Sequence, residues 1–96
     1  MKHRNAESID SIINRFLRQE GLETPLNQFR LIDAWTEVMG QAISRYTGDM
    51  YIKSEVLHVQ FRSPALKANL MMDRKNLVRR LNEYVGSQVI VDIVFH

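Results

Sequence analysis

The sequence predicts an α+β domain in which a three-stranded sheet is covered by helices on one face. Apolar residues alternate with polar ones over residues 56–61 and 88–95, which is typical of strands. Over longer segments before and between these two, apolar residues recur at spacings of three and four, which is typical of amphipathic helices. The expected order is helix, helix, strand, strand, helix, strand, because packing helical stripes against one side of a small sheet buries them all.

The middle of the chain gives the clearest signal. Leu57, Val59 and Phe61 alternate with polar residues, which predicts a half-buried strand. Ser63 then fits a helix N-cap, and Pro64 fits the first helical position, where the missing N–H removes no hydrogen bond. A strand that leads directly into a helix is therefore predicted here.

Two amphipathic helices are predicted before this strand. The first spans about residues 6–20, and Gly21 follows it where a left-handed residue ends many helices. After a linker at residues 21–25, the second helix runs to Met39, and a shorter helical segment follows Gly40. We expect a bend or a close packing contact at this glycine, because glycine weakens a helix interior.

Aromatic residues of the second helix are expected in the core. Trp35 and Phe29 both fall on its apolar side, so we assign them to packing rather than to a base-stacking surface.

A hairpin is predicted after the second helix. Residues 47–49 read as a turn, residues 50–53 as its first strand, and Ser54-Glu55 as the tight connection to the strand at 56–61. The connection lacks the Asn-Gly or Asp-Gly that a two-residue turn prefers.

The last third of the chain reads as one helix and one strand. A single helix is expected from Pro64 to about Val85, with Leu66, Leu70, Leu77, Leu81 and Tyr84 on its apolar stripe. Gly86 ends it, and the final strand covers residues 88–95. Because the helix reverses the chain direction, this strand should run parallel to the strand at 56–61.

The composition favours a folded soluble protein and argues against several kinds of site. The chain has 45% hydrophobic and 25% charged residues and no cysteine, which excludes disulfides and the thiolate ligands that zinc prefers. His3, His58 and His96 have no metal-binding spacing, and no glycine-rich phosphate loop is present. His58 and Asp92 both fall on polar strand faces, where we expect an open polar pair rather than a catalytic one. We expect no cofactor and no enzymatic activity.

The N-terminal residues lack the apolar segment of a secretory signal, and no apolar run reaches the ~20 residues that span a bilayer. We expect a cytoplasmic protein with no membrane partner and no small-molecule substrate. Residues 1–5 should be flexible, and residues 6–96 should form a single domain.

Basic residues are concentrated in the second half of the chain, although the net charge is only +2. Between residues 62 and 80 there are six basic residues and one acid, Asp73. This excess favours contact with phosphates, since Lys and Arg release counterions from nucleic acid; a solvated helix face is the alternative. The candidate DNA contacts are Lys53, Arg62, Lys67, Arg74, Lys75, Arg79 and Arg80.

Tyr51 and two methionines are further candidates for contact with partners. If Met50 and Ile52 face the core, Tyr51 faces solvent beside Lys53, where it either stacks on a nucleobase or packs across the strands. Met71 and Met72 fall partly off the apolar stripe and either form a protein-binding patch or fill gaps under another helix.

Several short motifs resemble, in order, those of the DciA-like family. The first block is matched by Ile32-Asp33-Ala34-Trp35, Val38-Met39-Gly40 and Ile43. The second is matched by Leu57-His58-Val59, Ser63-Pro64-Ala65-Leu66 and Leu70, and the last by Leu81-Asn82, Gly86, Val89 or Ile90, and Ile93. The resemblance covers about residues 8–95.

The resemblance implies a fold similar to KH domains and a role in bacterial chromosome replication. DciA proteins bind DNA and act with the replicative helicase, which they help to place on DNA. Three features depart from these patterns: Leu66 stands where many relatives have tryptophan, the hairpin turn has no glycine, and the chain lacks the Gly-x-x-Gly loop of true KH domains.

We therefore expect a nucleic-acid-binding accessory domain that acts with the replicative helicase. It would bind single- or double-stranded DNA without sequence preference through its basic residues. The alternative is a protein–protein interaction module without nucleic-acid affinity, which would use the first helix, Met71 and Met72 as its contact surface.

Overall fold

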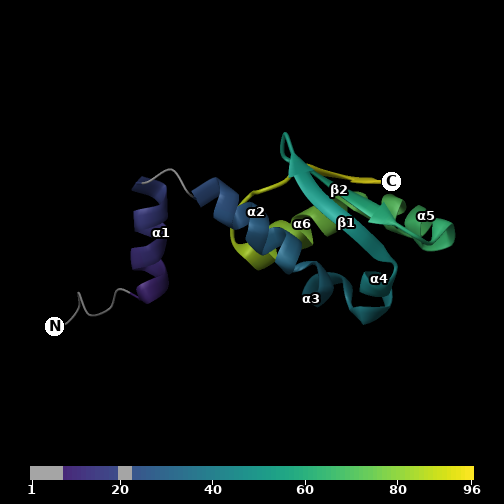
Figure 1. The fold of residues 1–96 in the computed structure, drawn as a ribbon, viewed down its shortest axis with the longest axis horizontal. Coiled ribbons are helices and arrows are strands. Elements are labelled where there is room, and N and C mark those ends of the chain that lie inside the picture. The colour runs from purple at the N-terminus through teal and green to yellow at the C-terminus, as the bar shows by residue number, and fades with distance from the viewer. Residues whose placement is uncertain (1–7, 20–22) are drawn as a thin grey trace.

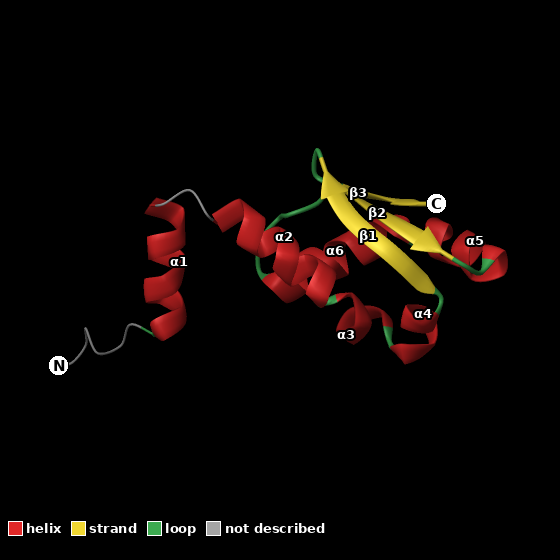
Figure 2. Cartoon of the chain, viewed as in Figure 1, coloured by secondary structure: helices red, strands yellow, loops and turns green. Residues whose placement is uncertain are grey.

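A computed structural model describes residues 8–19 and 23–96 of the chain (Figure 1). The expectations for residues 1–5 and for Gly21 lie outside these described residues. The elements follow in the order α1 (Ile9–Gln19), α2 (Glu23–Asp33), α3 (Trp35–Met39), α4 (Gln41–Arg45), β1 (Thr47–Lys53), β2 (Val56–Phe61), α5 (Pro64–Met72), α6 (Arg74–Val85) and β3 (Asp92–Phe95). The predicted α+β class is confirmed, and Figure 2 shows the three strands beside the helices.

The three strands form one mixed sheet with β2 in the centre. β1 pairs with β2 antiparallel, and β3 pairs with β2 parallel, with Leu57 opposite Ile93. The predicted direction of the last strand is therefore confirmed. The crossover from β2 to β3 passes through α5 and α6, which brings the two strands side by side.

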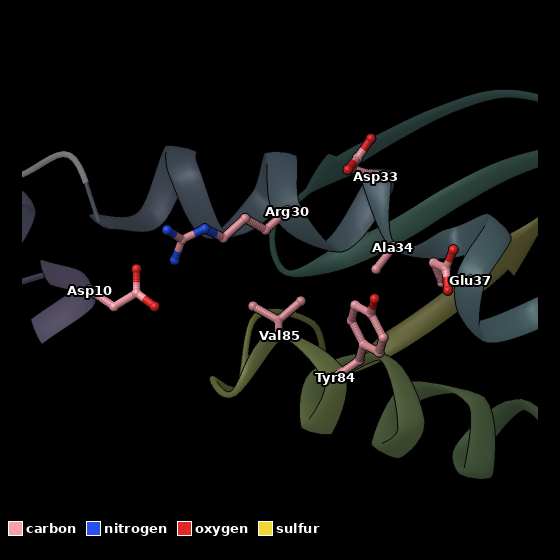
Figure 3. Close-up of a pocket in the computed structure, with 7 residues that line it drawn as sticks. All are labelled: Asp10, Arg30, Asp33, Ala34, Glu37, Tyr84 and Val85. Atoms are coloured by element: carbon pink, nitrogen blue, oxygen red, sulfur yellow. The ribbon is translucent and has the colours of Figure 1, made fainter. Parts of the chain in front are cut away.

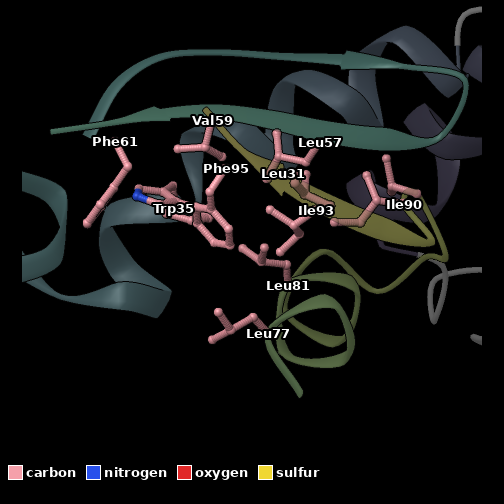
Figure 4. Close-up of a cluster of buried hydrophobic side chains, with 11 residues drawn as sticks. Leu31, Trp35, Leu57, Val59, Phe61, Leu77, Leu81, Ile90, Ile93 and Phe95 are labelled. Carbon is pink, nitrogen blue, oxygen red and sulfur yellow. The ribbon is translucent and has the colours of Figure 1, made fainter. Parts of the chain in front are cut away.

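The hydrophobic core lies between the sheet and the helices (Figure 4). Leu57 and Val59 of β2 are fully buried, as their alternation with polar residues predicts. Trp35 is 1% exposed, and its indole N–H donates to Thr47 Oγ1 over 2.9 Å, so this buried donor is satisfied. Phe95 packs against the Trp35 ring, with the ring centroids 6.4 Å apart.

The predicted buried face of α2 is partly wrong. Phe29, which was expected in the core, is 66% exposed, whereas Leu31 is fully buried. Because successive helical residues are about 100° apart, Phe29 lies opposite Leu31 on the helix. Ala34 and Trp35, three and four residues after Leu31, share the buried side with it.

Two predicted long helices are each broken. The second predicted helix divides at Ala34, whereas the expected separation at Gly40 is observed: Gly40 has φ +90° and lies between α3 and α4. It also begins earlier than expected, at Glu23, with Pro25 in the first turn, where proline is tolerated. The observed order of elements therefore contains more helices than the predicted one.

The predicted helix from Pro64 to Val85 is broken at Asp73. Asp73 leaves the helical conformation, with φ −102° and ψ 15°, and its carboxylate accepts from the Asn76 side chain over 3.3 Å. Ser63 caps α5 as predicted, and Gly86 ends α6 with φ +85°. Tyr84, expected on the apolar stripe, is 59% exposed.

The hairpin has the expected tight connection but a longer first strand. The predicted turn at residues 47–49 is wrong: these residues belong to β1, which is irregular between Thr47 and Met50. A Cβ at Gly48 would lie 3.2 Å from the Cβ of Gln60, so glycine permits the two strands to approach here. Ser54 and Glu55 form the connection with φ of 51° and 63°.

The last strand is shorter than predicted, because Asn82 takes the hydrogen bonds of the segment before it. The Asn82 side chain accepts from the backbone N–H groups of Val89 and Ile90, over 3.0 and 3.2 Å. It donates to the Ile90 carbonyl over 2.8 Å. Val89 and Ile90 are buried but are not strand residues, and β3 begins only at Asp92.

Candidate nucleic-acid interface

The exposed face of α6 carries two of the predicted DNA contacts. Lys75 and Arg79 are one helical turn apart and both exposed, so they project from the same side of the helix. Arg79 Nη1 lies 3.0 Å from Glu83 Oε1 in an exposed ion pair, and Arg79 also donates to the Asn76 side chain. Glu83 therefore offsets part of the positive charge of this face.

Three other predicted contacts are tied to the protein itself. Arg74 Nε lies 3.0 Å from Asp92 Oδ1, which joins the start of α6 to the start of β3. Arg80 Nη2 donates to the Val38 carbonyl of α3 over 2.7 Å. Arg62 Nη2 donates to the Arg45 carbonyl over 2.7 Å. Each of these guanidinium groups therefore has a structural contact in addition to its charge.

The two remaining predicted contacts are lysines on different elements. Lys53 is exposed at the end of β1, and Lys67 is half-buried on α5. The structure therefore distributes the seven basic residues over β1, the end of β2, α5 and α6, and two of them bond to carbonyls of α3 and α4.

The face of the sheet opposite the core carries a row of three rings. Tyr51 is 53% exposed, as predicted from the inward-facing Met50 and Ile52, and it stacks on its cross-strand partner His58 with ring centroids 4.6 Å apart and planes 6° apart. His58 meets His96 edge to edge, with their Nδ1 and Nε2 atoms 2.9 Å apart, ring centroids 5.2 Å apart and planes 18° apart. We call Tyr51, His58 and His96 the ring row.

The sequence predicts only part of the ring row. The period-two pattern places Tyr51 and His58 on the outward face, but nothing in the sequence brings His96 to them. The parallel pairing of β3 with β2 does so, because His96 continues this pairing: its N–H donates to the Val59 carbonyl over 2.8 Å.

His58 and Asp92 are not partners. His58 pairs with His96, whereas Asp92 pairs with Arg74, and in the strand register Asp92 lies opposite Val56. Among residues 8–19 and 23–96, no group of three or more His, Asp or Glu residues is arranged to hold a metal ion. Within the same ranges, no helix is long and apolar enough to cross a membrane.

A hollow of about 400 Å³ lies between α2 and α6, with Asp10 of α1 at one side (Figure 3). Its polar lining consists of Arg30, Asp33, Glu37 and the Tyr84 hydroxyl, and its apolar lining of Ala34 and Val85. None of these groups is a serine or histidine nucleophile or base, so the lining does not assemble the parts of an acyl-transfer site.

Apolar side chains are exposed at two places. On α1, which lies to one side of the other elements in Figure 1, Ile9, Ile12 and Phe16 are 72%, 49% and 55% exposed. At the junction of α5 and α6, Met71 and Met72 are 45% and 88% exposed. Of the two predicted roles of these methionines, gap filling under another helix is therefore wrong for Met72.

Comparison with known proteins agrees with the motif resemblance. The family described as "Dna[CI] antecedent, DciA" matches residues 8–95. A UPF0232 protein from Corynebacterium glutamicum (strain R) is 27% identical over 90 residues, which are 94% of this chain and 51% of that protein. UPF0232 proteins from Streptomyces coelicolor and Streptomyces avermitilis are 33% and 32% identical over 85 residues, 86% of this chain and 45% and 47% of theirs.

The chain thus spans about half the length of the curated relatives it matches. Since the family match covers nearly all of its residues, including every described helix and strand, this chain belongs to the DciA family.

Proposed function

We propose that this chain is a DNA-binding accessory domain that acts with the replicative helicase, as its DciA family membership implies. The observation that carries the DNA-binding part is the exposed pair Lys75 and Arg79 on one side of α6, inside a stretch with six basic residues and one acid. Such residues bind phosphates without reading sequence, so the binding should be non-specific and salt-sensitive. A KH-like arrangement and a cytoplasmic location belong to the same proposal.

The remaining basic residues contribute less directly to the proposed surface. Three of them already bond to oxygen atoms of the protein, so replacing Arg62, Arg74 or Arg80 would disturb packing as well as charge. Lys53 and Lys67 lie on other elements and extend the positive region beyond α6. Substitution of Lys75 and Arg79 on α6 therefore gives the most direct test of the proposal.

The double variant Lys75→Gln/Arg79→Gln should bind DNA more weakly without unfolding. Each lost phosphate contact should lower the slope of log affinity against log salt by about 1, so the slope should fall by about 2. Fluorescence anisotropy of labelled single-stranded and duplex DNA, at about 50 and 200 mM salt, measures both quantities. Unchanged affinity and slope would show that this face does not contact DNA.

Two single variants serve as controls for charge and position. Glu83→Gln should strengthen binding, because it removes the acid that pairs with Arg79. Arg30→Gln removes an exposed cation from α2 and should change affinity by less than about twofold, as expected for a cation outside the contact surface. Circular dichroism of every variant establishes that the fold is kept.

A protein-interaction module is the second candidate, and the exposed apolar residues of α1 favour it. In this case Ile12→Ser/Phe16→Ser should abolish capture of the purified replicative helicase in nuclease-treated buffer, while DNA binding stays unchanged. Capture that survives this substitution would exclude α1 as the helicase contact.

A further inference from the structure

The open face of the sheet carries three aromatic rings in a row, across strands that are far apart in the sequence. Tyr51 lies on β1, His58 on β2 and His96 directly after β3. Tyr51 and His58 are nearly parallel, and His58 and His96 are 18° from parallel. The core does not account for this arrangement, because buried side chains of the sheet, such as Leu57 and Val59, point to the opposite face.

Tyr51 forms the open end of the row. β1 is an edge strand with no further strand beside it among residues 8–19 and 23–96, and the ring is 53% exposed although one of its faces rests on His58. The ring face turned away from His58 is therefore directed toward solvent. A planar aromatic ligand placed there would continue the existing stack.

Polar groups suited to the edges of a nucleobase surround the row. Asp49, Tyr51, His58, Gln60 and His96 line a hollow of about 340 Å³, a size within the usual range for small-molecule sites. His58 Nδ1 and His96 Nε2 are engaged with one another, which leaves His58 Nε2 and His96 Nδ1 directed elsewhere. The Gln60 amide supplies both a donor and an acceptor, and the Asp49 carboxylate supplies an acceptor for an amino group.

The cations beside the ring row are suited to contact the phosphates of a nucleic-acid strand. Lys53 shares the outward face with Tyr51 by strand alternation, and Arg62 follows the end of β2; the nearest acids in sequence are Glu55 and Asp49. Asp92 on β3 is already paired with Arg74. Stacking platforms next to cations are the usual means by which proteins bind unpaired nucleotides, because every base has a π-face.

We propose that the ring row is a stacking site for unpaired bases of single-stranded nucleic acid. This inference rests on the proposed DNA binding and adds to it a second surface, distinct from the Lys75 and Arg79 face. Duplex DNA would not use the ring row, because its bases are already stacked and their faces are covered.

The test compares Tyr51→Ala with Tyr84→Ala on two probes: a labelled single strand of about 16 nucleotides, the upper site size of one small single-strand-binding fold, and the matching duplex. Tyr84 is a matched control, since it is 59% exposed but lies on α6. Tyr51→Ala should weaken single-strand binding by about fivefold or more and leave duplex binding within about twofold. Tyr84→Ala should change neither.

A variant that keeps an aromatic ring at position 51 shows whether a loss of binding comes from lost stacking or from unfolding. Tyr51→Trp keeps a larger ring face and should bind the single strand at least as tightly as the wild type, with quenching of the new indole fluorescence on binding. His58→Ala should also weaken single-strand binding, because it removes the support of the Tyr51 ring. Circular dichroism checks that each variant is folded.

The outcomes distinguish this site from DNA binding in general. Loss on the single strand alone supports the ring row. Equal loss on both probes, or no loss with Tyr51→Ala, overturns the stacking site while the Lys75 and Arg79 surface stands. A wild-type chain that binds neither probe at low salt overturns both proposals.

Discussion

Asn82 connects the end of α6 to the chain that returns to the sheet. Its side chain makes three hydrogen bonds with the backbone of Val89 and Ile90, and both of these residues are buried. No local sequence signal identifies this role, because asparagine within a helix normally reads as a weak helix former. The same side chain also explains why alternation over residues 88–91 does not produce a strand.

Replacing Asn82 with alanine should destabilise the fold by about 2–3 kcal/mol, because each hydrogen bond contributes about 0.5–1.5 kcal/mol and the buried backbone groups lose their partner. Urea denaturation followed by circular dichroism measures the change. Asn69→Ala, at an exposed position of α5, is the matched control and should stay within about 0.5 kcal/mol. Equal effects of the two variants would contradict the structural role of Asn82.

At the scale of elements, the pairing of β1 with β2 imposes a backbone conformation on the hairpin turn that its two residues disfavour. Ser54 and Glu55 both adopt positive φ, which side-chain-bearing residues rarely do. Pairing of β1 with β2, from Lys53 opposite Val56 to Met50 opposite Val59, fixes a two-residue connection of this kind. The Glu55 carbonyl also accepts from the Val91 N–H over 2.8 Å, which ties the turn to the segment before β3.

The variant Ser54→Asn/Glu55→Gly should therefore stabilise the protein. Asparagine and glycine tolerate positive φ, and relief of a left-handed conformation at a non-glycine residue amounts to roughly 1 kcal/mol. The midpoint of thermal unfolding should rise by several degrees, as about 1 kcal/mol gives about 4–8 °C in a domain of this size. A lower midpoint would show that the side chains of Ser54 or Glu55 stabilise the turn in another way.

At the scale of the whole molecule, a single core joins α2, the sheet and α6. Leu31 of α2, Leu57 and Ile93 of the sheet, and Leu81 of α6 are all fully buried in one cluster (Figure 4). None of the α1 side chains that the structure describes belongs to this cluster, and Figure 1 shows α1 beside rather than over the sheet. Removal of a core side chain should therefore affect the stability of all elements from α2 to β3 together.

Leu31→Ala should destabilise the protein by about 2–5 kcal/mol, the usual cost of truncating a buried leucine. Phe29→Ala removes a larger side chain from the same helix but should change stability by less than about 0.5 kcal/mol, since Phe29 is 66% exposed. Chemical denaturation of the pair measures the difference. A larger loss of stability in Phe29→Ala than in Leu31→Ala would indicate that Phe29 is a core residue, as its helical spacing predicts.

The sequence by itself determined the fold class, the central strand, the capped start of α5, the outward position of Tyr51 and the family. These features follow from short-range spacing, capping and ordered motifs, which are properties of neighbouring residues. Only the tertiary structure decided that Leu31 rather than Phe29 is buried, that Arg74 pairs with Asp92, and that His96 joins Tyr51 and His58. Each of these depends on which elements pack together, and strand order and helix rotation are set by long-range contacts that no local pattern records.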